Sequence, residues 1–115
     1  MRKVGIYIFP DVEELDFVGV FEVLAKTRIM KDEGKLPIDE PLQVDIIAFE
    51  DMITCSNGLY VKPHKVVDDF EGYDLLIVPG GRGVSKLLDD VELLKRIKDF
   101  AEKHVICSVC TGALA

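Results

Sequence analysis

The sequence predicts an α/β protein built on a parallel β-sheet. Short runs rich in Ile, Val and Leu alternate with segments of helical periodicity or loop composition, and the clearest runs are residues 4–9, 43–49, 74–78 and 105–109. The run at 74–78 is continuously apolar after its first residue, which is typical of a strand buried on both faces of a parallel sheet. In such folds the crossovers are right-handed, and a site forms at the carboxyl ends of the strands.

The first strand and the first helix follow each other closely. Val4 to Phe9 is a short apolar run that ends at Pro10-Asp11, a pair typical of a turn. Beyond it, apolar residues recur at the i, i+3, i+4, i+7 spacing of one helical face, namely Phe17, Val20, Phe21 and Leu24. This spacing predicts a helix from about 12 to 27. Residues 31–41 carry two Pro, one Gly and several charges, and we expect a loop there.

The middle of the chain predicts a second strand, a hairpin and a third strand. Residues 43–49 have the composition of a strand, whereas the segment 54–63 holds Asn57-Gly58 between β-prone residues, the strongest short signal for a hairpin. The strand at 74–78 ends at Pro79-Gly80-Gly81, where we expect a tight loop.

A further helix is expected to begin at a capping box formed by Asp89 and Glu92. It should end near His104, and its apolar face comprises Leu93, Ile97, Phe100 and Ala101. Residues 105–109 form the last strand, which passes without a polar linker into a helix expected near Thr111. About five residues remain for that helix, too few without packing partners, so we expect a domain larger than 115 residues or an unfinished last element.

Length, charge and cysteine content narrow the possible functions. The 115 residues suit one domain or part of one, and 49 % hydrophobic residues provide for a core. With 14 basic and 21 acidic residues the formal net charge is −7, which disfavours nucleic acid and acidic membranes as partners. No apolar run approaches the roughly 20 residues of a membrane helix, and we expect a cytoplasmic protein. Three cysteines, an odd number, do not suggest a disulfide framework.

Three segments should meet at the carboxyl edge of the predicted sheet, namely 10–16, 79–83 and 110–112. Cys110 is the most reactive candidate, because a cysteine between a strand and a helix lies near the positive end of the helix dipole, which lowers the thiol pKa. Taken alone, this position suits a buried, inert cysteine about equally well. Cys107 and Cys110 form a C-x-x-C pair, but residues three apart on a strand face opposite ways, which disfavours a redox pair.

Two further groups could assist a nucleophile at this edge. Asp16 interrupts an apolar pair on the side of the first helix expected to face the sheet, where a carboxylate could exchange protons with a thiolate. The backbone N–H groups of Gly80 and Gly81 could stabilise an oxyanion, although an ordinary turn would use the same glycines. Glu13 and Glu14 are expected only to favour the start of the helix.

The sequence predicts neither a metal site nor a nucleotide site. His64 and His104 have no partners at ligand spacing, and we expect both to be structural or surface residues. The glycine-rich segment lacks the spacings of the dinucleotide and P-loop motifs.

Three segments together, 9–19, 78–83 and 108–113, resemble the DJ-1/PfpI (ThiJ) superfamily. Their L-D-x-x-G and V-C-T-G patterns resemble the isonitrile hydratase branch and the related domains fused to AraC-type regulators. The resemblance implies a flavodoxin-like sandwich, of which residues 1–115 are the N-terminal portion, ending just after the nucleophile elbow. It also implies a homodimer or higher homo-oligomer that acts on a small molecule without a metal or an organic cofactor.

The resemblance also implies roles for individual residues. Cys110 matches the elbow nucleophile and Asp16 the acidic group beside it, while Gly81 and Thr111, together with Gly80, match the backbone donors of an oxyanion pocket. The implied reaction adds the Cys110 thiolate to an isonitrile carbon, and water then releases an N-substituted formamide. Peptidase and glyoxalase-type branches carry His where Thr111 stands, so these activities rank lower. The alternatives are a redox- or ligand-sensing domain in which Cys110 is oxidised, and a non-catalytic piece of a domain.

Overall fold

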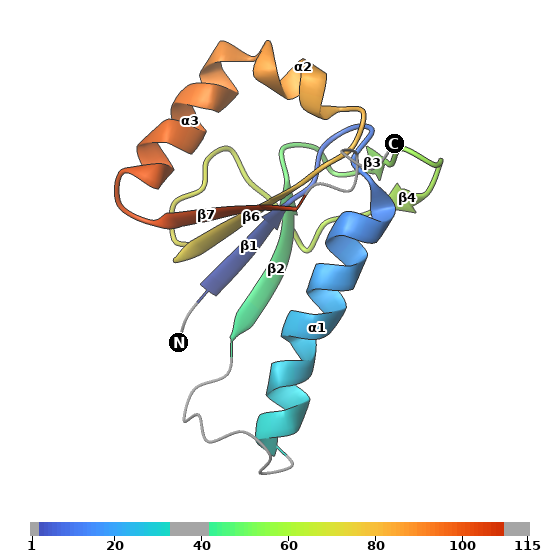
Figure 1. Cartoon of the computed structure of the whole chain (residues 1–115), viewed down its shortest axis with the longest axis vertical. Helices are drawn as coiled ribbons and strands as arrows, with labels where there is room; N and C mark the ends of the chain where they lie inside the picture. Colours follow the sequence, from blue (N-terminus) through green and yellow to red (C-terminus); the bar gives the residue numbers. More distant parts are fainter. Residues whose placement is uncertain (1–2, 33–41, 110–115) are drawn as a thin grey trace.

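A five-stranded parallel sheet runs through the centre of the protein (Figure 1). The computed structural model describes residues 3–32 and 42–109, with the backbone alone at 28–32. The strand order is β5-β2-β1-β6-β7, and every neighbouring pair is parallel. The bounds are Lys3–Tyr7 for β1, Gln43–Ala48 for β2, Lys65–Val66 for β5, Leu75–Pro79 for β6 and Val105–Val109 for β7. The parallel α/β fold predicted from the apolar runs is therefore confirmed.

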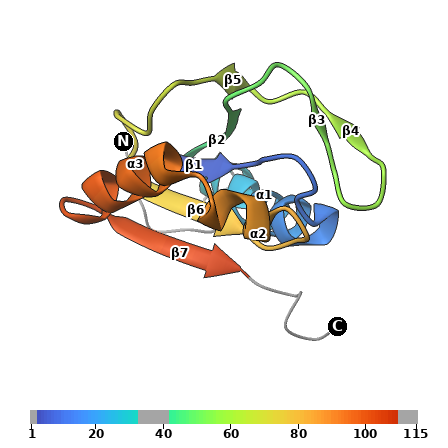
Figure 2. The same cartoon turned by 90° about the horizontal axis from the view of Figure 1, so that it is seen from above.

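Helices cover both faces of the sheet. α1 (Glu14–Asp32) connects β1 to β2, whereas α2 (Val84–Leu88) and α3 (Val91–Ala101) connect β6 to β7. The two connections run in opposite directions across the sheet, so right-handed crossovers place α1 on one face and α2 with α3 on the other (Figure 1, Figure 2). No helix in the described part of the chain is both long and apolar enough to span a membrane.

The core forms around the central strand β1. Ile6 in β1, and Ile8 and Phe9 directly after it, are at most 1 % exposed, because this central segment lies between neighbouring strands and is covered by helices on each face. On the face covered by α3 the aromatic rings form a chain of contacts. The ring centroids of Tyr7 and Phe70 lie 5.3 Å apart, and those of Phe70 and Phe100 lie 6.4 Å apart. These edge-on pairs anchor α3 to the sheet.

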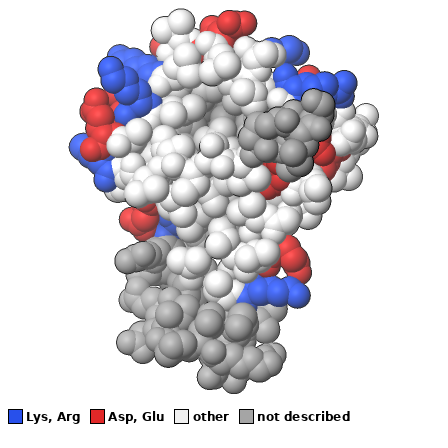
Figure 3. Space-filling view, viewed as in Figure 1, with Lys and Arg blue, Asp and Glu red and all other residues white. Residues whose placement is uncertain are grey.

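β7 differs from the inner strands in its exposure. Among the described residues it pairs with β6 alone, and Val105 at its start is 63 % exposed. Leu15 and Val23 on the neighbouring α1 are each 69 % exposed. Figure 3 shows that the middle of this face, where β7 lies, carries few charged side chains. This part of the surface therefore carries few charges, exposes several large apolar side chains and is covered by no described segment.

The first helix begins and ends later than its periodicity predicts. Val12 forms an antiparallel bridge with Gly81, and Asp11 has a left-handed φ of 66°, so neither can join the helix. α1 starts at Glu14 and continues to Asp32, into the segment expected to be a loop. Residues 33–41 of that expected loop lie outside the described residues, as does the helix expected near Thr111.

The predicted hairpin is confirmed, and two short elements were not predicted. β3 (Ile53–Thr54) and β4 (Tyr60–Val61) pair antiparallel around Asn57-Gly58. β5 has only two residues and forms through its pairing with β2. Local sequence patterns cannot predict this long-range pairing. α2 occupies part of the segment after β6, where a tight loop was expected.

The predicted cap of the third helix is wrong by one residue. Asp90, not Asp89, has the extended backbone of an N-cap, and its side chain accepts a hydrogen bond of 3.1 Å from the Leu93 N–H. Asp89 instead closes α2. The helix ends at Ala101, three residues before His104, and the Ala101 side chain is exposed although it was expected on the apolar face.

Candidate functional site

The loops that follow β1 and β6 meet where the direction of the strand order reverses, the position at which open α/β sheets bind ligands. Their backbones are in direct contact. The Glu13 N–H donates a hydrogen bond of 2.9 Å to the Gly80 carbonyl, and Val12 bridges to Gly81. The first and second predicted site segments therefore come together, as the topology predicts.

Two glycines make this contact possible. At Gly81, with a φ of 130°, a Cβ would lie 2.5 Å from the Glu13 nitrogen. At Gly83 a Cβ would overlap the Pro10 carbonyl oxygen. Loop packing thus accounts for both residues without a ligand. The N–H of Gly81 nevertheless donates to no described residue, so it remains available as a hydrogen-bond donor.

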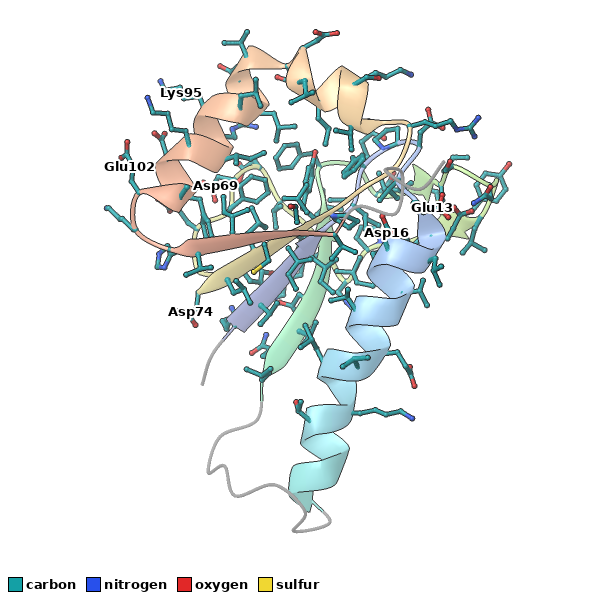
Figure 4. All side chains as sticks on the ribbon, in the orientation of Figure 1. Glu13, Asp16, Asp69, Asp74, Lys95 and Glu102 are labelled. Atoms are coloured by element: carbon teal, nitrogen blue, oxygen red, sulfur yellow. The ribbon has the colours of Figure 1, made fainter. Side chains whose placement is uncertain are left out.

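Asp16 lies in the first turn of α1 and faces the sheet, as its position in the sequence predicts (Figure 4). It is 2 % exposed, and the Gly80 N–H donates a hydrogen bond of 3.1 Å to its Oδ2. The Gly80 N–H is therefore directed at Asp16, and not at an open pocket. This contact joins the candidate acidic group to the glycine-rich loop.

A shallow apolar groove of about 470 Å³ lies beside Asp16. Its far wall is Val109, the last residue of β7, and its other lining residues belong to α1: Leu15, Asp16, Gly19, Val20, Val23 and Leu24. Val109 directly precedes Cys110 in the chain. Cys110 and Thr111 themselves lie outside the described residues. The structure thus brings together Asp16, Gly80 and Gly81. It also describes β7, the strand that directly precedes Cys110.

The β3–β4 hairpin is held against this site by contacts that sequence reasoning missed. Both oxygens of Glu14 accept hydrogen bonds from Asn57, at 2.9 Å from its backbone N–H and at 3.0 Å from its side-chain amide. Glu13 accepts a further bond of 3.2 Å from that amide. On the other side, Arg82 Nε donates to the Ser56 hydroxyl at 3.1 Å. Glu13 and Glu14 therefore do more than favour the helix start, but their partners lie over 40 residues away, where no local signal exists.

We predict that acid loosens the hairpin through Glu14. Burial alone would raise the pKa of Glu14, but hydrogen bonds from its own backbone and from Asn57 and Leu59 together hold the pKa below its usual value of 4.5. Because the folded pKa is depressed, the stabilisation is complete above about pH 4.5 and is lost as the pH falls through the folded pKa. Exchange of the Asn57 amide hydrogen, measured by NMR, should accelerate in that range beyond its intrinsic pH dependence. In Glu14→Gln that extra acceleration should vanish, and its persistence would assign the effect to another group.

The two described cysteines differ from the expected nucleophile. Burial, and after it the charges of Glu14 and Glu13, raise the pKa of Cys55 to about 11, so this thiol stays protonated at neutral pH. Cys107 is exposed on β7. Within residues 3–32 and 42–109, no group of three His, Cys, Asp or Glu side chains is placed to hold a metal ion.

The two histidines have structural contacts, as expected. His64 Nδ1 accepts a hydrogen bond of 2.8 Å from the Ile46 N–H, and its ring lies 5.6 Å from that of Phe21. The His104 ring packs on Phe100 at 4.9 Å between centroids. Neither residue lines the groove beside Asp16.

The sequence of the whole chain matches one family. The family model described as DJ-1/PfpI matches residues 2–115. The chain belongs to the DJ-1/PfpI family. This DJ-1/PfpI protein is similar to the isonitrile hydratase of Pseudomonas putida: the two are 35 % identical in an alignment 115 positions long that covers 97 % of this chain and 45 % of that protein. The predicted family is thus confirmed.

Solved structures of DJ-1/PfpI proteins share the fold. Oxidised DJ-1 of Toxoplasma gondii superposes with a TM-score of 0.73 at 22 % identity, over 96 % of this chain and 56 % of that one. A DJ-1 superfamily protein of Salmonella typhimurium superposes with a TM-score of 0.76 at 16 % identity, over 98 % and 57 %. The flavodoxin-like fold implied by the resemblance is confirmed, and the chain spans about half the length of the relatives it matches.

Proposed function

We propose that this chain belongs to a cysteine-dependent hydratase of small molecules, and that its reaction converts an isonitrile to an N-substituted formamide. The observation that carries the proposal is the Asp16 carboxylate, which is 2 % exposed at the point where the strand order reverses and lines a groove that ends at Val109. A buried acid beside the expected position of a thiol suits proton transfer. The 35 % identity to an isonitrile hydratase favours this substrate class.

Each candidate residue has a distinct role in the proposal. Cys110 is the nucleophile and Asp16 exchanges protons with the reacting atoms. Gly80 is a positioning residue, because its N–H holds the Asp16 carboxylate at 3.1 Å. The N–H of Gly81, which donates to no described residue, serves with that of Thr111 as the oxyanion donor.

The proposed steps balance without any redox partner. The thiolate sulfur of Cys110 bonds to the isonitrile carbon, and that carbon takes a proton from Asp16, giving a thioimidate. The oxygen of a water molecule then adds to the C=N carbon; one of the two water protons returns to Asp16 and the other is transferred to the nitrogen. Cleavage of the C–S bond releases the formamide and regenerates the thiolate. The net change is the addition of one water molecule, so no electron donor or acceptor takes part.

The test is turnover together with trapping of the intermediate. The protein is incubated with an alkyl isonitrile, formamide is measured by chromatography, and the thioimidate C=N bond is reduced before peptide mass spectrometry. We expect formamide to accumulate and the adduct to occur on Cys110. Cys107, an exposed thiol, is the internal control and should remain unmodified. Equal labelling of Cys107 and Cys110, or the absence of formamide, would contradict the proposal and favour the sensing alternative.

The same proposal includes self-association. The homodimer implied by the resemblance would bury apolar side chains that are now exposed, such as Leu15 and Val23 on α1.

A further inference from the structure

A second cavity lies on the opposite face of the sheet from the groove. It has a volume of about 190 Å³ and opens between the carboxyl ends of β1 and β2 and the start of α3. Sites for drug-sized ligands usually span about 300 to 1,000 Å³, so this cavity suits a ligand of only a few heavy atoms. Its walls combine aromatic, acidic and basic groups, among them Tyr7, Phe9, Phe49, Glu50, Lys86 and Asp90.

The Tyr7 phenol is the feature that points to a ligand. Tyr7 is 4 % exposed, and its ring packs 5.1 Å from that of Phe49 and 5.6 Å from that of Phe9. Its hydroxyl makes no hydrogen bond with any described residue. Every described polar side-chain atom that is fully shielded from solvent has a hydrogen-bond partner, so the Tyr7 hydroxyl is not fully shielded. The hydroxyl therefore reaches the cavity that Tyr7 lines. Buried phenols normally have a hydrogen-bond partner, and here the partner is water or a ligand group that displaces this water from the cavity.

The Tyr7 phenol is uncharged at neutral pH. Burial, and after it the charges of Asp90 and Glu50, raise the pKa of Tyr7 to about 12, while Arg96 acts in the opposite direction. At neutral pH the hydroxyl therefore keeps its proton and presents an oxygen that can accept a hydrogen bond.

The charged side chains around the cavity carry more negative than positive charge. Lys86 lines the cavity, but its ammonium group forms an ion pair of 3.8 Å with the carboxylate of Asp11, which is not a lining residue. Glu50 forms no ion pair with any described residue, and Asp90 accepts only the capping bond from Leu93. The other cation near the cavity, Arg96, lies over the Phe49 ring and is paired with Glu92 at 3.5 Å. With both cations paired to other carboxylates, Glu50 and Asp90 leave the cavity with excess negative charge, which a positively charged ligand would offset.

We propose that this cavity binds a small organic ammonium ion. Its N–H groups donate to the carboxylates of Glu50 and Asp90 and to the Tyr7 oxygen, and its short alkyl group lies against Phe9 and Phe49. The cavity and the groove beside Asp16 use opposite faces of the sheet, so this binding does not depend on the proposed hydratase reaction.

The test is a titration of the 115-residue protein, labelled with ¹⁵N, with n-propylammonium chloride at constant ionic strength. n-Propanol and sodium propionate are matched probes of similar shape that are neutral and negative. We expect saturable shifts of the Tyr7, Glu50 and Asp90 amide signals with the ammonium ion, and binding at least about tenfold weaker for the other two probes.

Three variants assign the binding to the cavity. Tyr7→Phe removes only the hydroxyl, and Glu50→Gln removes a charge from an exposed residue without disturbing the core; each should weaken binding at least about tenfold. Tyr60→Phe, a phenol that is 72 % exposed on β4, should bind as the parent protein does. Equal binding of all three probes, an unchanged affinity in both Tyr7→Phe and Glu50→Gln, or the absence of saturable shifts would overturn the proposal.

Discussion

Replacing Asp16 by Asn is expected to lower the rate of isonitrile hydration at least about a hundredfold, the usual range for the loss of a general acid–base group. The asparagine has nearly the shape of the aspartate and keeps an oxygen that can accept the 3.1 Å bond from the Gly80 N–H. It cannot deliver or take up a proton. The expected loss therefore lies in kcat, while the loop around Gly80 remains in place.

The measurement is formamide production under saturating isonitrile, with circular dichroism as a check of the fold. Glu22→Gln is the matched control, because it replaces a carboxylate by an amide on the same helix, at a surface residue whose one ion pair among the described side chains is with Lys26. This control should keep the parent rate. A rate for Asp16→Asn within about threefold of the parent would show that Asp16 serves only to hold the glycine-rich loop. Cys110→Ser, assayed beside it, should show no turnover at all.

Gly81→Ala and Gly83→Ala are each expected to destabilise the protein by roughly 2–4 kcal/mol. An alanine at 81 would place its Cβ 2.6 Å from the Asp11 carbonyl oxygen, at a φ of 130° that side chains rarely adopt. At 83 the methyl group would overlap the Pro10 carbonyl oxygen. In both cases the neighbour is backbone, which cannot rotate away, so the two loops must separate.

Urea unfolding followed by circular dichroism measures this effect. Gly19→Ala is the control, because a Cβ at Gly19, within α1, would meet no described atom within 4 Å apart from the backbone of its own helix. That variant should be neutral or stabilised by up to about 1 kcal/mol, since alanine favours a helix more than glycine does. An unfolding midpoint of Gly83→Ala equal to that of the parent protein would show that the loops are not held together as described.

Local sequence signals predicted the elements that depend on neighbouring residues. The apolar runs located β1, β2, β6 and β7, and Asn57-Gly58 located the hairpin, because a turn of this kind is encoded by the conformational preferences of its own residues. The cap of α3 was misplaced by one residue because Asp89 and Asp90 are both suitable capping residues. The choice of Asp90 depends on α2, which was not predicted and which ends at Asp89.

The same distinction holds for the site. The sequence by itself determined the family, the parallel α/β fold and the position of Asp16 on the buried side of its helix, because these follow from motif order and short-range periodicity. Only the tertiary structure decided that Glu14 holds the hairpin, that Gly81 and Gly83 permit backbone contact with the first loop, and that Tyr7 lines a small cavity. Each of these contacts joins residues brought together by chain crossovers, so their partners cannot be inferred from local spacing.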